Sequence, residues 1–260
     1  MSTGIITYFS FFYGQKAVDE IVGQLQTKIV DSVQTRLDHF LAVPPAIVEQ
    51  NARSIQKGIL DLDDPTALER HFWNQVHVHK GISPIYMGYA QGGISMAIWR
   101  EEKDTGRLGN VVQISTSHGK QADAQYLYLT DEQGNRLNLV ETLPNYDVRQ
   151  RPWFLNSIKR GKAGWSQVFL SFAGDALVIN RSKPVYDDKG DLLAVVCADL
   201  NLTHISDFLR GLAIGKNGRA FIIDQSTKLV ATSAKEEPLR KQKGKVRPIR
   251  ITVSKSDDPL

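Results

Sequence analysis

A cluster of side chains able to bind an anion lies in the segment LPNYDVRQRPWFLNSIKRG, residues 143–161. Pro152 disfavours helical geometry at Arg151 and suits a first helical turn, so we expect a helix that begins at Pro152. The amides of Trp153 and Phe154 would then be unpaired donors at a helix N-terminus, which favours an anion. Arg151 adds a planar guanidinium that fits a carboxylate, and Trp153 adds an apolar wall with an indole N–H.

Two interpretations fit this spacing. One is a clamp for a small carboxylate, and the other is a stack of Arg151 on Trp153, capped by Tyr146, that only holds the helix in place. A second candidate group is Asp199, which closes the apolar run LLAVVCADL. A carboxylate there costs free energy unless it has a partner, so it either binds a ligand group or reaches water at the strand end.

The elements that must position these residues begin with a long helix. Apolar residues at steps of three and four from Val18 to Phe40 predict one amphipathic helix over residues 14–45. Pro44 and Pro45 are expected to interrupt it, and a second helical piece is expected from about residue 46 to residue 60.

From residue 82 the pattern changes to short strands. Hairpins are predicted around the turns QGG, EQGN and DDKGD, with a helix inserted at Pro152. This order predicts an α+β fold with an antiparallel sheet of about five strands drawn from residues 82–200. We assign residues 46–203 to this first module and residues 204–260 to a smaller, incomplete second module with a basic tail.

The charge balance argues against a nucleic-acid partner. The segment RKQKGKVRPIR, residues 240–250, holds six basic residues and no acid, and the rest of the chain has 26 Lys and Arg against 28 Asp and Glu. The body is therefore not a basic surface, and the tail has no aromatic residue for base stacking. We expect the tail to be a solvated, mobile segment.

Signals for catalysis or metal binding are weak. GLAIGKN has three residues between its glycines where a phosphate-binding loop has four, and it has Asn217 where that loop has Ser or Thr. His77 and His79 are two positions apart, so on a helix they point to different sides. We therefore expect no enzyme activity in this chain, and no metal or other cofactor.

The motif YDVRQRPWF and the run GWSQVFLSFAGDALVINRSKPVYDDKGDLLAVVCADLNL resemble the membrane-distal module of double Cache (dCACHE) sensor domains. These are extracytoplasmic ligand sensors of bacterial membrane receptors. The run IGKNGRAFIIDQSTKLVATS resembles the start of their membrane-proximal module, and the resemblance covers most of residues 14–235. It implies a long N-terminal helix followed by two PAS-like modules.

The resemblance also implies ligand contacts. In members that bind amino acids, the motif's tyrosine, second arginine and tryptophan hold the carboxylate, and a strand aspartate holds the amino group. A further family tyrosine is Phe154 here, and a tyrosine and an aspartate of the next strand align with Phe169 and Ser171. Part of the amine-binding half is therefore missing, and we expect an amino acid or another small carboxylate as the ligand. The predicted ligand-binding residues are Tyr146, Arg151, Trp153, Phe154, Phe169, Ser171 and Asp199.

The apolar, aromatic start of the chain gives a further expectation. Residues 1–13 fit either the end of a transmembrane helix or a short apolar helix packed on the same domain. With the family resemblance, we expect a membrane receptor whose sensor region lies on the extracytoplasmic, periplasmic side. We also expect a homodimer through the long helix, with the return membrane helix and any output module outside this chain. The alternative is a ligand-free dimerisation module of a membrane receptor.

Overall fold

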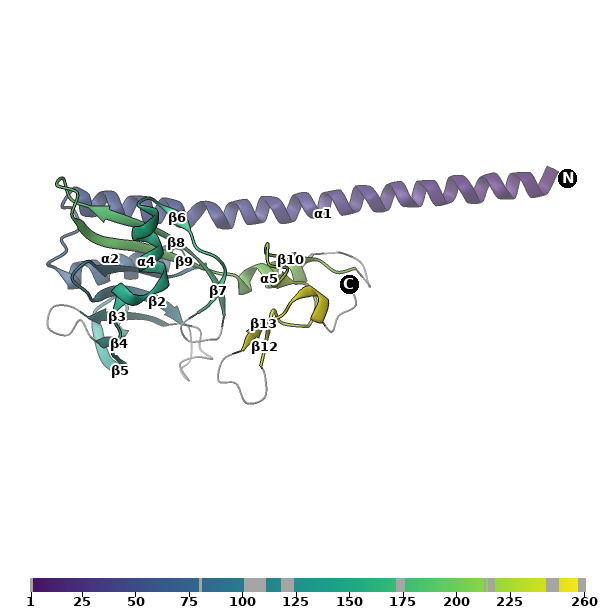
Figure 1. The fold of residues 1–260 in the computed structure, drawn as a ribbon. Coiled ribbons are helices and arrows are strands. Elements are labelled where there is room, and N and C mark those ends of the chain that lie inside the picture. Colours follow the sequence, from purple (N-terminus) through teal and green to yellow (C-terminus); the bar gives the residue numbers. More distant parts are fainter. Residues whose placement is uncertain are drawn as a thin grey trace.

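A computed structural model gives the fold, which combines a long helix, a sheet-based module and a smaller second module (Figure 1). It describes the whole chain except Met1, Lys80, 101–110, 118–123, 172–175, Ala213, 215–217, 242–247 and 257–260. Side chains are also outside the description for residues 2–19, Arg100 and residues 111–117.

The long helix α1 runs from Ser2 to Gln56 without a break, which confirms one helix over the predicted residues 14–45. The expected interruption at Pro44 and Pro45 is wrong, because both prolines lie inside α1. Two proline residues remove two backbone donors. The turns that follow pack on the sheet through β8 and β9, and this packing offsets the lost bonds. The side chains buried there are Ile47, Val48, Ala52 and Ile55.

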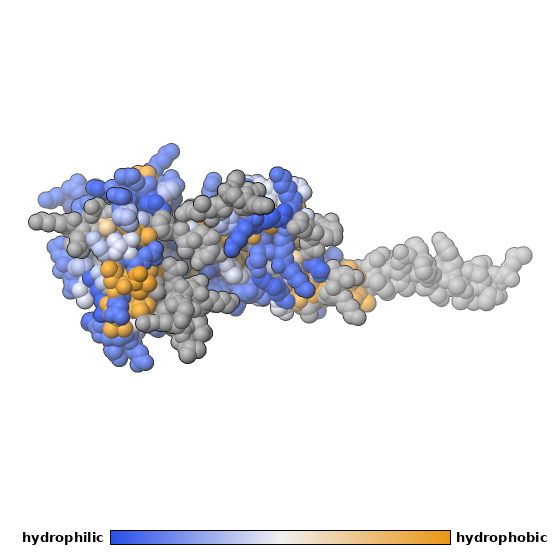
Figure 2. Space-filling model, turned by 90° about the horizontal axis from the view of Figure 1, so that it is seen from below, coloured by the Kyte–Doolittle hydropathy of each residue, from blue (hydrophilic) through white to orange (hydrophobic). Residues whose placement is uncertain are grey.

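The apolar stripe of α1 divides into two parts. Val33, Leu37 and Phe40 are partly buried against the core. Val22 and Leu25 are 46% and 47% exposed, and Figure 2 shows hydrophobic atoms where this part of α1 meets the grey N-terminal end. Among the stripe residues whose side chains the structure describes, those in the C-terminal half therefore pack on the core of the chain itself.

The predicted membrane-helix end, residues 1–13, falls at the start of α1, where the side chains lie outside the description. Within the described residues, none of the helices has a stretch of the length and hydrophobicity that a membrane crossing requires.

The central sheet is antiparallel, as predicted, and its strand order is β5-β4-β3-β2-β1-β9-β8-β6, with β7 also paired to β8. About five strands were expected, but the described residues form nine, because segments such as β6 and β7 are two residues long and too short to leave a sequence pattern. The strands are β1 Ile82–Tyr89, β2 Ile94–Arg100, β3 Val111–Ser117, β4 Ala124–Thr130, β5 Arg136–Pro144, β6 Gly164–Trp165, β7 Phe169–Leu170, β8 Leu177–Tyr186 and β9 Leu192–Asn201.

The sheet is covered on both faces. Helices α1 and α2 (Pro65–Val78) cover one face, where β1 contributes Ile85 and Met87 to the main core. The other face carries Tyr86 and Cys197 in a smaller core with α4 (Pro152–Arg160), which is the helix predicted at Pro152. Side chains alternate between the two faces along a strand. A central strand that is buried on both faces therefore has a continuous apolar sequence.

The second module follows helix α5 (Thr203–Arg210). It contains two small hairpins and one 3-10 turn, η3, in the described residues. Their bounds are β10 Phe221–Ile223, β11 Leu229–Thr232, β12 Leu239–Arg240, β13 Ile249–Arg250 and η3 Val253–Lys255.

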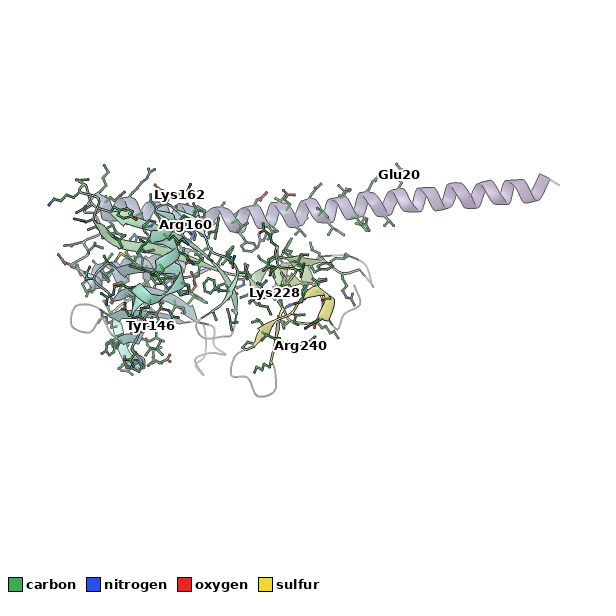
Figure 3. The ribbon with its side chains drawn as sticks, viewed as in Figure 1. Glu20, Tyr146, Arg160, Lys162, Lys228 and Arg240 are labelled. Carbon is green, nitrogen blue, oxygen red and sulfur yellow. The ribbon has the colours of Figure 1, made fainter. Side chains whose placement is uncertain are left out.

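The expectation of a solvated, mobile basic tail is wrong at both ends of that segment, because Arg240 lies in β12 and Arg250 in β13 (Figure 3 labels Arg240). The guanidinium of Arg250 is 2.6 Å from a carboxylate oxygen of Asp224. Burial alone would raise the pKa of Asp224, but hydrogen bonds from Ser226 and Arg250 lower it to about 2. The basic residues between β12 and β13 fall mostly in 242–247, outside the described residues.

Candidate ligand-binding site

The arginine-rich motif forms the 3-10 turn η2 (Val148–Gln150) and the start of helix α4. Arg149 lies in η2, and Arg151 lies between the two elements. The turn η2 begins where the Asp147 carboxylate accepts a hydrogen bond from the Arg149 amide. The same carboxylate pairs with the Arg149 guanidinium at 2.9 Å, which lowers the pKa of Asp147. Arg151 then takes extended backbone angles, φ −81° and ψ 138°, directly before α4. Asp147 and Arg149 therefore shape the turn that presents Arg151.

One interpretation of the motif expected the Arg151 guanidinium to stack on Trp153, but it lies over the Tyr146 ring instead. The guanidinium carbon lies 5.0 Å from the centre of the Tyr146 ring, a cation–π contact that orients the planar group. Trp153 instead meets the Tyr86 ring edge to face, with ring centres 5.0 Å apart. Burial raises the pKa of Tyr146, while Arg151 and a hydrogen bond from Trp153 act to lower it.

The N-terminus of α4 offers fewer free amides than expected. The Phe154 amide, predicted as an unpaired donor, donates to the Arg151 carbonyl at 3.0 Å. The Phe154 ring is 2% exposed and packs in the smaller core rather than among the residues that line the cavity described below.

Gly88 on β1 allows this arrangement. A Cβ atom at Gly88 would lie 2.7 Å from the Trp153 ring and 3.2 Å from the Phe154 ring, closer than side chains pack. A glycine here lets the indole lie directly on the sheet, so Gly88 positions Trp153.

A second polar group lies across the sheet face from the motif. Asp199 on β9 accepts two hydrogen bonds at Oδ1, one from the Tyr86 hydroxyl at 3.1 Å and one from Asn180 Nδ2 at 2.6 Å. Asn180 Nδ2 also donates to the Tyr86 hydroxyl oxygen at 3.1 Å. Asp199 is only 6% exposed, so a carboxylate that simply reaches water at a strand end is excluded.

Burial changes the proton affinity of this group. Desolvation raises the pKa of Asp199 to about 7, although hydrogen bonds from Asn180 and Tyr86 act to lower it. Burial and the neighbouring Asp199 charge raise the pKa of the Tyr86 hydroxyl well above its usual value. The Asp199 carboxyl therefore holds its proton more tightly than an exposed aspartate, and a cation that arrives beside it favours the ionised form.

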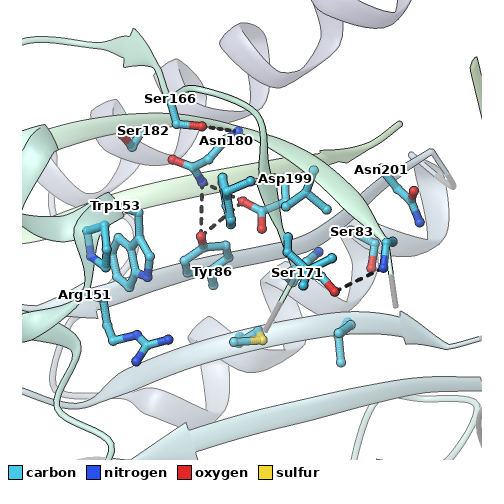
Figure 4. A pocket seen from close by; sticks show the side chains of 18 of the residues that line it. Ser83, Tyr86, Arg151, Trp153, Ser166, Ser171, Asn180, Ser182, Asp199 and Asn201 are labelled. Atoms are coloured by element: carbon cyan, nitrogen blue, oxygen red, sulfur yellow. Dashed lines mark hydrogen bonds between the residues drawn. The ribbon is translucent and has the colours of Figure 1, made fainter. Parts of the chain in front are cut away.

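One cavity of about 1370 Å³ joins the two groups. The polar residues of both groups are drawn in Figure 4, with Arg151 and Trp153 on one side and Asp199 on the other side of Tyr86. The cavity exceeds the volume of a single amino acid, and pockets for small ligands usually hold about 300–1,000 Å³. Six of the seven predicted site residues line it, the exception being Phe154: Tyr146, Arg151, Trp153, Phe169, Ser171 and Asp199.

Other polar residues line the same cavity and were not identified from the sequence, among them Tyr86, Asn180 and Ser182. Ser182 Oγ accepts a hydrogen bond from the Arg160 guanidinium at 2.9 Å, which ties the end of α4 to β8. The available signal was Asn180 itself, because an asparagine inside the strand LVINRSKPVY must satisfy its amide within the fold.

The comparisons with known proteins agree with this fold. Residues 96–207 match the family model described as the first PDC sensor domain of methyl-accepting chemotaxis protein-like proteins. The curated relatives include the methyl-accepting chemotaxis protein McpA of Pseudomonas putida, 25% identical over 99 residues, which covers 38% of this chain and 15% of McpA. TlpB of Bacillus subtilis is 20% identical over 232 residues, covering 89% of this chain and 28% of TlpB. The chain thus spans less than a third of the length of these relatives.

Two solved structures share the fold. The ligand-binding domain of the Campylobacter jejuni chemoreceptor Tlp3, in complex with 4-methylisoleucine, has a TM-score of 0.54 at 15% identity, over 83% of this chain and 71% of that one. The ligand-binding domain of Mlp24 with asparagine has a TM-score of 0.53 at 16% identity, over 84% and 73%. The family match supports the resemblance to double Cache domains, since residues 96–207 are similar to the first PDC sensor domain of chemoreceptor-like proteins, and the two structures share the fold of chemoreceptor ligand-binding domains.

Proposed function

We propose that this chain is the sensor region of a chemoreceptor-type membrane protein and binds a small carboxylate-bearing molecule, either an amino acid or an organic acid. The observation that carries the proposal is the single cavity that both Arg151 and Asp199 line. The structures of Tlp3 with 4-methylisoleucine and of Mlp24 with asparagine support the same ligand class.

The proposed clamp has two ends. At one end the Arg151 guanidinium, oriented on the Tyr146 ring, meets the ligand carboxylate in a two-pronged ion pair. Trp153 supplies an apolar wall beside it, and Phe169 and Ser171 line the cavity from β7 and the residue after it. At the other end Asp199 takes the ligand's amino group if it has one.

Binding can be relayed along a continuous set of elements. Strand β9 leads into α5, and Asn201, Thr203 and His204 at this junction line the cavity. On α5, the Phe208 ring lies 5.8 Å from the guanidinium carbon of Arg36 on α1. We propose that a ligand shifts α5 and, through it, α1, with the signal passing to a membrane-anchored output part and the sensor on the extracytoplasmic side. The chemotaxis receptors among the relatives support this setting.

The binding proposal is tested by calorimetry with the proteinogenic amino acids and a set of small organic acids. For whichever compound binds, Arg151→Ala should weaken affinity about 30- to 1,000-fold, because a bidentate charge-assisted contact is lost. Arg53→Ala is the control: it removes an exposed arginine of α1 that is outside the cavity lining and pairs with Glu49. Equal affinity of Arg151→Ala and wild type would place the site elsewhere.

The relay is tested by hydrogen exchange with and without the bound compound. Residues 29–43 of α1, which hold the half of the stripe that contacts the core, should change their protection on binding. Residues 136–140 of β5, an edge strand away from α5, serve as the internal reference. Unchanged exchange in α1 at saturating ligand would remove α1 from the relay.

A second candidate function is a dimerisation module. It rests on exposed apolar residues of α1, namely Ile21, Val22, Leu25 and Val30. We propose that they contact the same helix of a second copy. The cavity disfavours the ligand-free form of this idea, but dimerisation and sensing are compatible. Sedimentation of wild type and Leu25→Asp tests the contact, and a wild-type protein that stays monomeric at high concentration would contradict it.

A further inference from the structure

Asn180 is the most constrained polar residue of the cavity. It lies on β8 directly opposite Asp199 in the β8–β9 pairing, and it is 0% exposed. Its Nδ2 donates to Asp199 Oδ1 and to the Tyr86 hydroxyl oxygen. When a ligand cation beside Asp199 keeps it ionised, the carboxylate only accepts hydrogen bonds, so the amide nitrogen faces Asp199 and the carbonyl oxygen points the other way.

That carbonyl oxygen has no hydrogen-bond partner among the described residues. The next side chain on the same face of β8, Ser182, has its Oγ engaged by Arg160. In Figure 4 the Asn180 oxygen points away from Asp199, on the side of Trp153. A buried acceptor without a donor is unfavourable, and native proteins rarely keep one unless a bound molecule supplies the donor.

Asp199 presents a second acceptor nearby. Both of its hydrogen bonds are accepted by Oδ1, and among the described residues none donates to Oδ2. One wall of the cavity therefore holds two acceptors without donors among the described residues, Asp199 Oδ2 and the buried Asn180 Oδ1, on facing positions of adjacent strands. A ligand group that satisfies both must carry at least two donors, and a hydroxyl group carries only one.

We propose that Asn180 is a specificity-determining residue whose Oδ1 accepts one N–H of a ligand's primary ammonium group while Asp199 Oδ2 accepts another. This inference rests on the proposed function and narrows it, because it selects a carboxylate that bears a primary amine over a plain or hydroxylated carboxylate. The Asn180 carbonyl is shielded from solvent in this structure, so a small shift of the cavity wall accompanies the contact.

The first test uses wild-type protein and changes the ligand. Calorimetry compares each proteinogenic amino acid with its 2-hydroxy acid and its N-methyl and N,N-dimethyl forms. We expect the hydroxy acid and the dimethyl form to bind about 10- to 100-fold more weakly than the amino acid, with the monomethyl form between. A hydroxy acid that binds as tightly as its amino acid, or a panel in which no primary amine binds, overturns the inference.

The second test changes the protein. Asn180→Leu, a substitution of similar size, should reduce the ratio between amino acid and N,N-dimethyl affinity toward one, because the dimethyl form has one N–H and loses only the Asn180 contact; a purely structural role would not do this. Asn180→Ser keeps a smaller acceptor and should retain part of the ratio, and thermal unfolding of both variants checks the fold. An unchanged ratio in the folded variants overturns the inference. A nitrogen-free compound whose binding is lost in Arg151→Ala leaves the carboxylate clamp standing and removes only the role of Asn180.

Discussion

The two ends of the cavity are built in opposite ways. The proposed carboxylate end comes from nine consecutive residues, 146–154, where the turn η2 and the start of helix α4 bring Tyr146, Arg151 and Trp153 together. The proposed amine end comes from three strands, and its bond between Tyr86 and Asp199 spans 113 positions of sequence. A local site needs only correct turns, whereas a non-local one needs the strand order and register of the whole sheet. The two ends should therefore respond differently to mutation.

A substitution of Gly88 should produce the largest effect on stability and binding, because Gly88 lies where the two ends meet. Gly88→Val places methyl groups where the Trp153 and Phe154 rings already lie. We expect α4 to move off the sheet, with a loss of about 1–3 kcal/mol in the free energy of unfolding and loss of measurable ligand binding. Denaturant unfolding and calorimetry measure the two effects.

Gly81→Ala is the matched control for that substitution. A Cβ atom at Gly81 would meet only a Phe40 ring carbon at 3.9 Å, an ordinary contact, so stability and binding should stay near wild type. If Gly88→Val bound ligand as well as Gly81→Ala, the placement of Trp153 on β1 would not matter for the site.

Asp199→Asn should affect only the amine end. We expect about 10- to 100-fold weaker binding of an amino acid, because a hydrogen bond to a charged group is lost, and little change for a plain carboxylate. Calorimetry on one ligand of each kind measures the contrast. Equal losses for both ligands would mean that the two ends do not act separately.

The same substitution should also change how stability depends on pH. Folding raises the pKa of Asp199 to about 7 from its ordinary value of 3.8, so between these pH values the folded protein holds a proton that the unfolded chain releases. This contribution to stability is present below about pH 4 and is lost as pH rises through 7, with a slope of up to about 1.4 kcal/mol per pH unit. Asp199→Asn should remove this slope and be more stable than wild type at pH 8. Parallel pH profiles of the two proteins would contradict the raised pKa.

Tyr86→Phe should give the smallest effect. It keeps the ring against Trp153 and removes one hydrogen bond to Asp199, so an amino acid should bind about 2- to 10-fold more weakly. Because that bond favours the ionised carboxylate, the loss should be larger at pH 7 than at pH 8.5. A loss independent of pH would indicate that the hydroxyl acts on the ligand directly.

Much of the fold could be predicted from sequence because its signals are local. The stripe from Val18 to Phe40 predicted α1, and the turn residues between apolar runs predicted the hairpins. The prediction was wrong at Pro44 and Pro45, because the packing of the following turns on β8 and β9 is a tertiary effect that overrides the local preference of proline.

The sequence by itself determined the carboxylate end, since Pro152 sets the start of α4 and the motif places Arg151 before it. Only the tertiary structure decided what surrounds Asp199. Tyr186 pairs with Leu192 next to the turn, and a regular hairpin continued from that pair would place Ile179 opposite Asp199. A register shift between Val185 and Tyr186 moves the pairing by one residue, so Asn180 lies opposite Asp199 instead. A one-residue shift exchanges the two faces of a strand, so this irregularity, together with the pairing of β1 with β9, turns an apolar wall into a polar one.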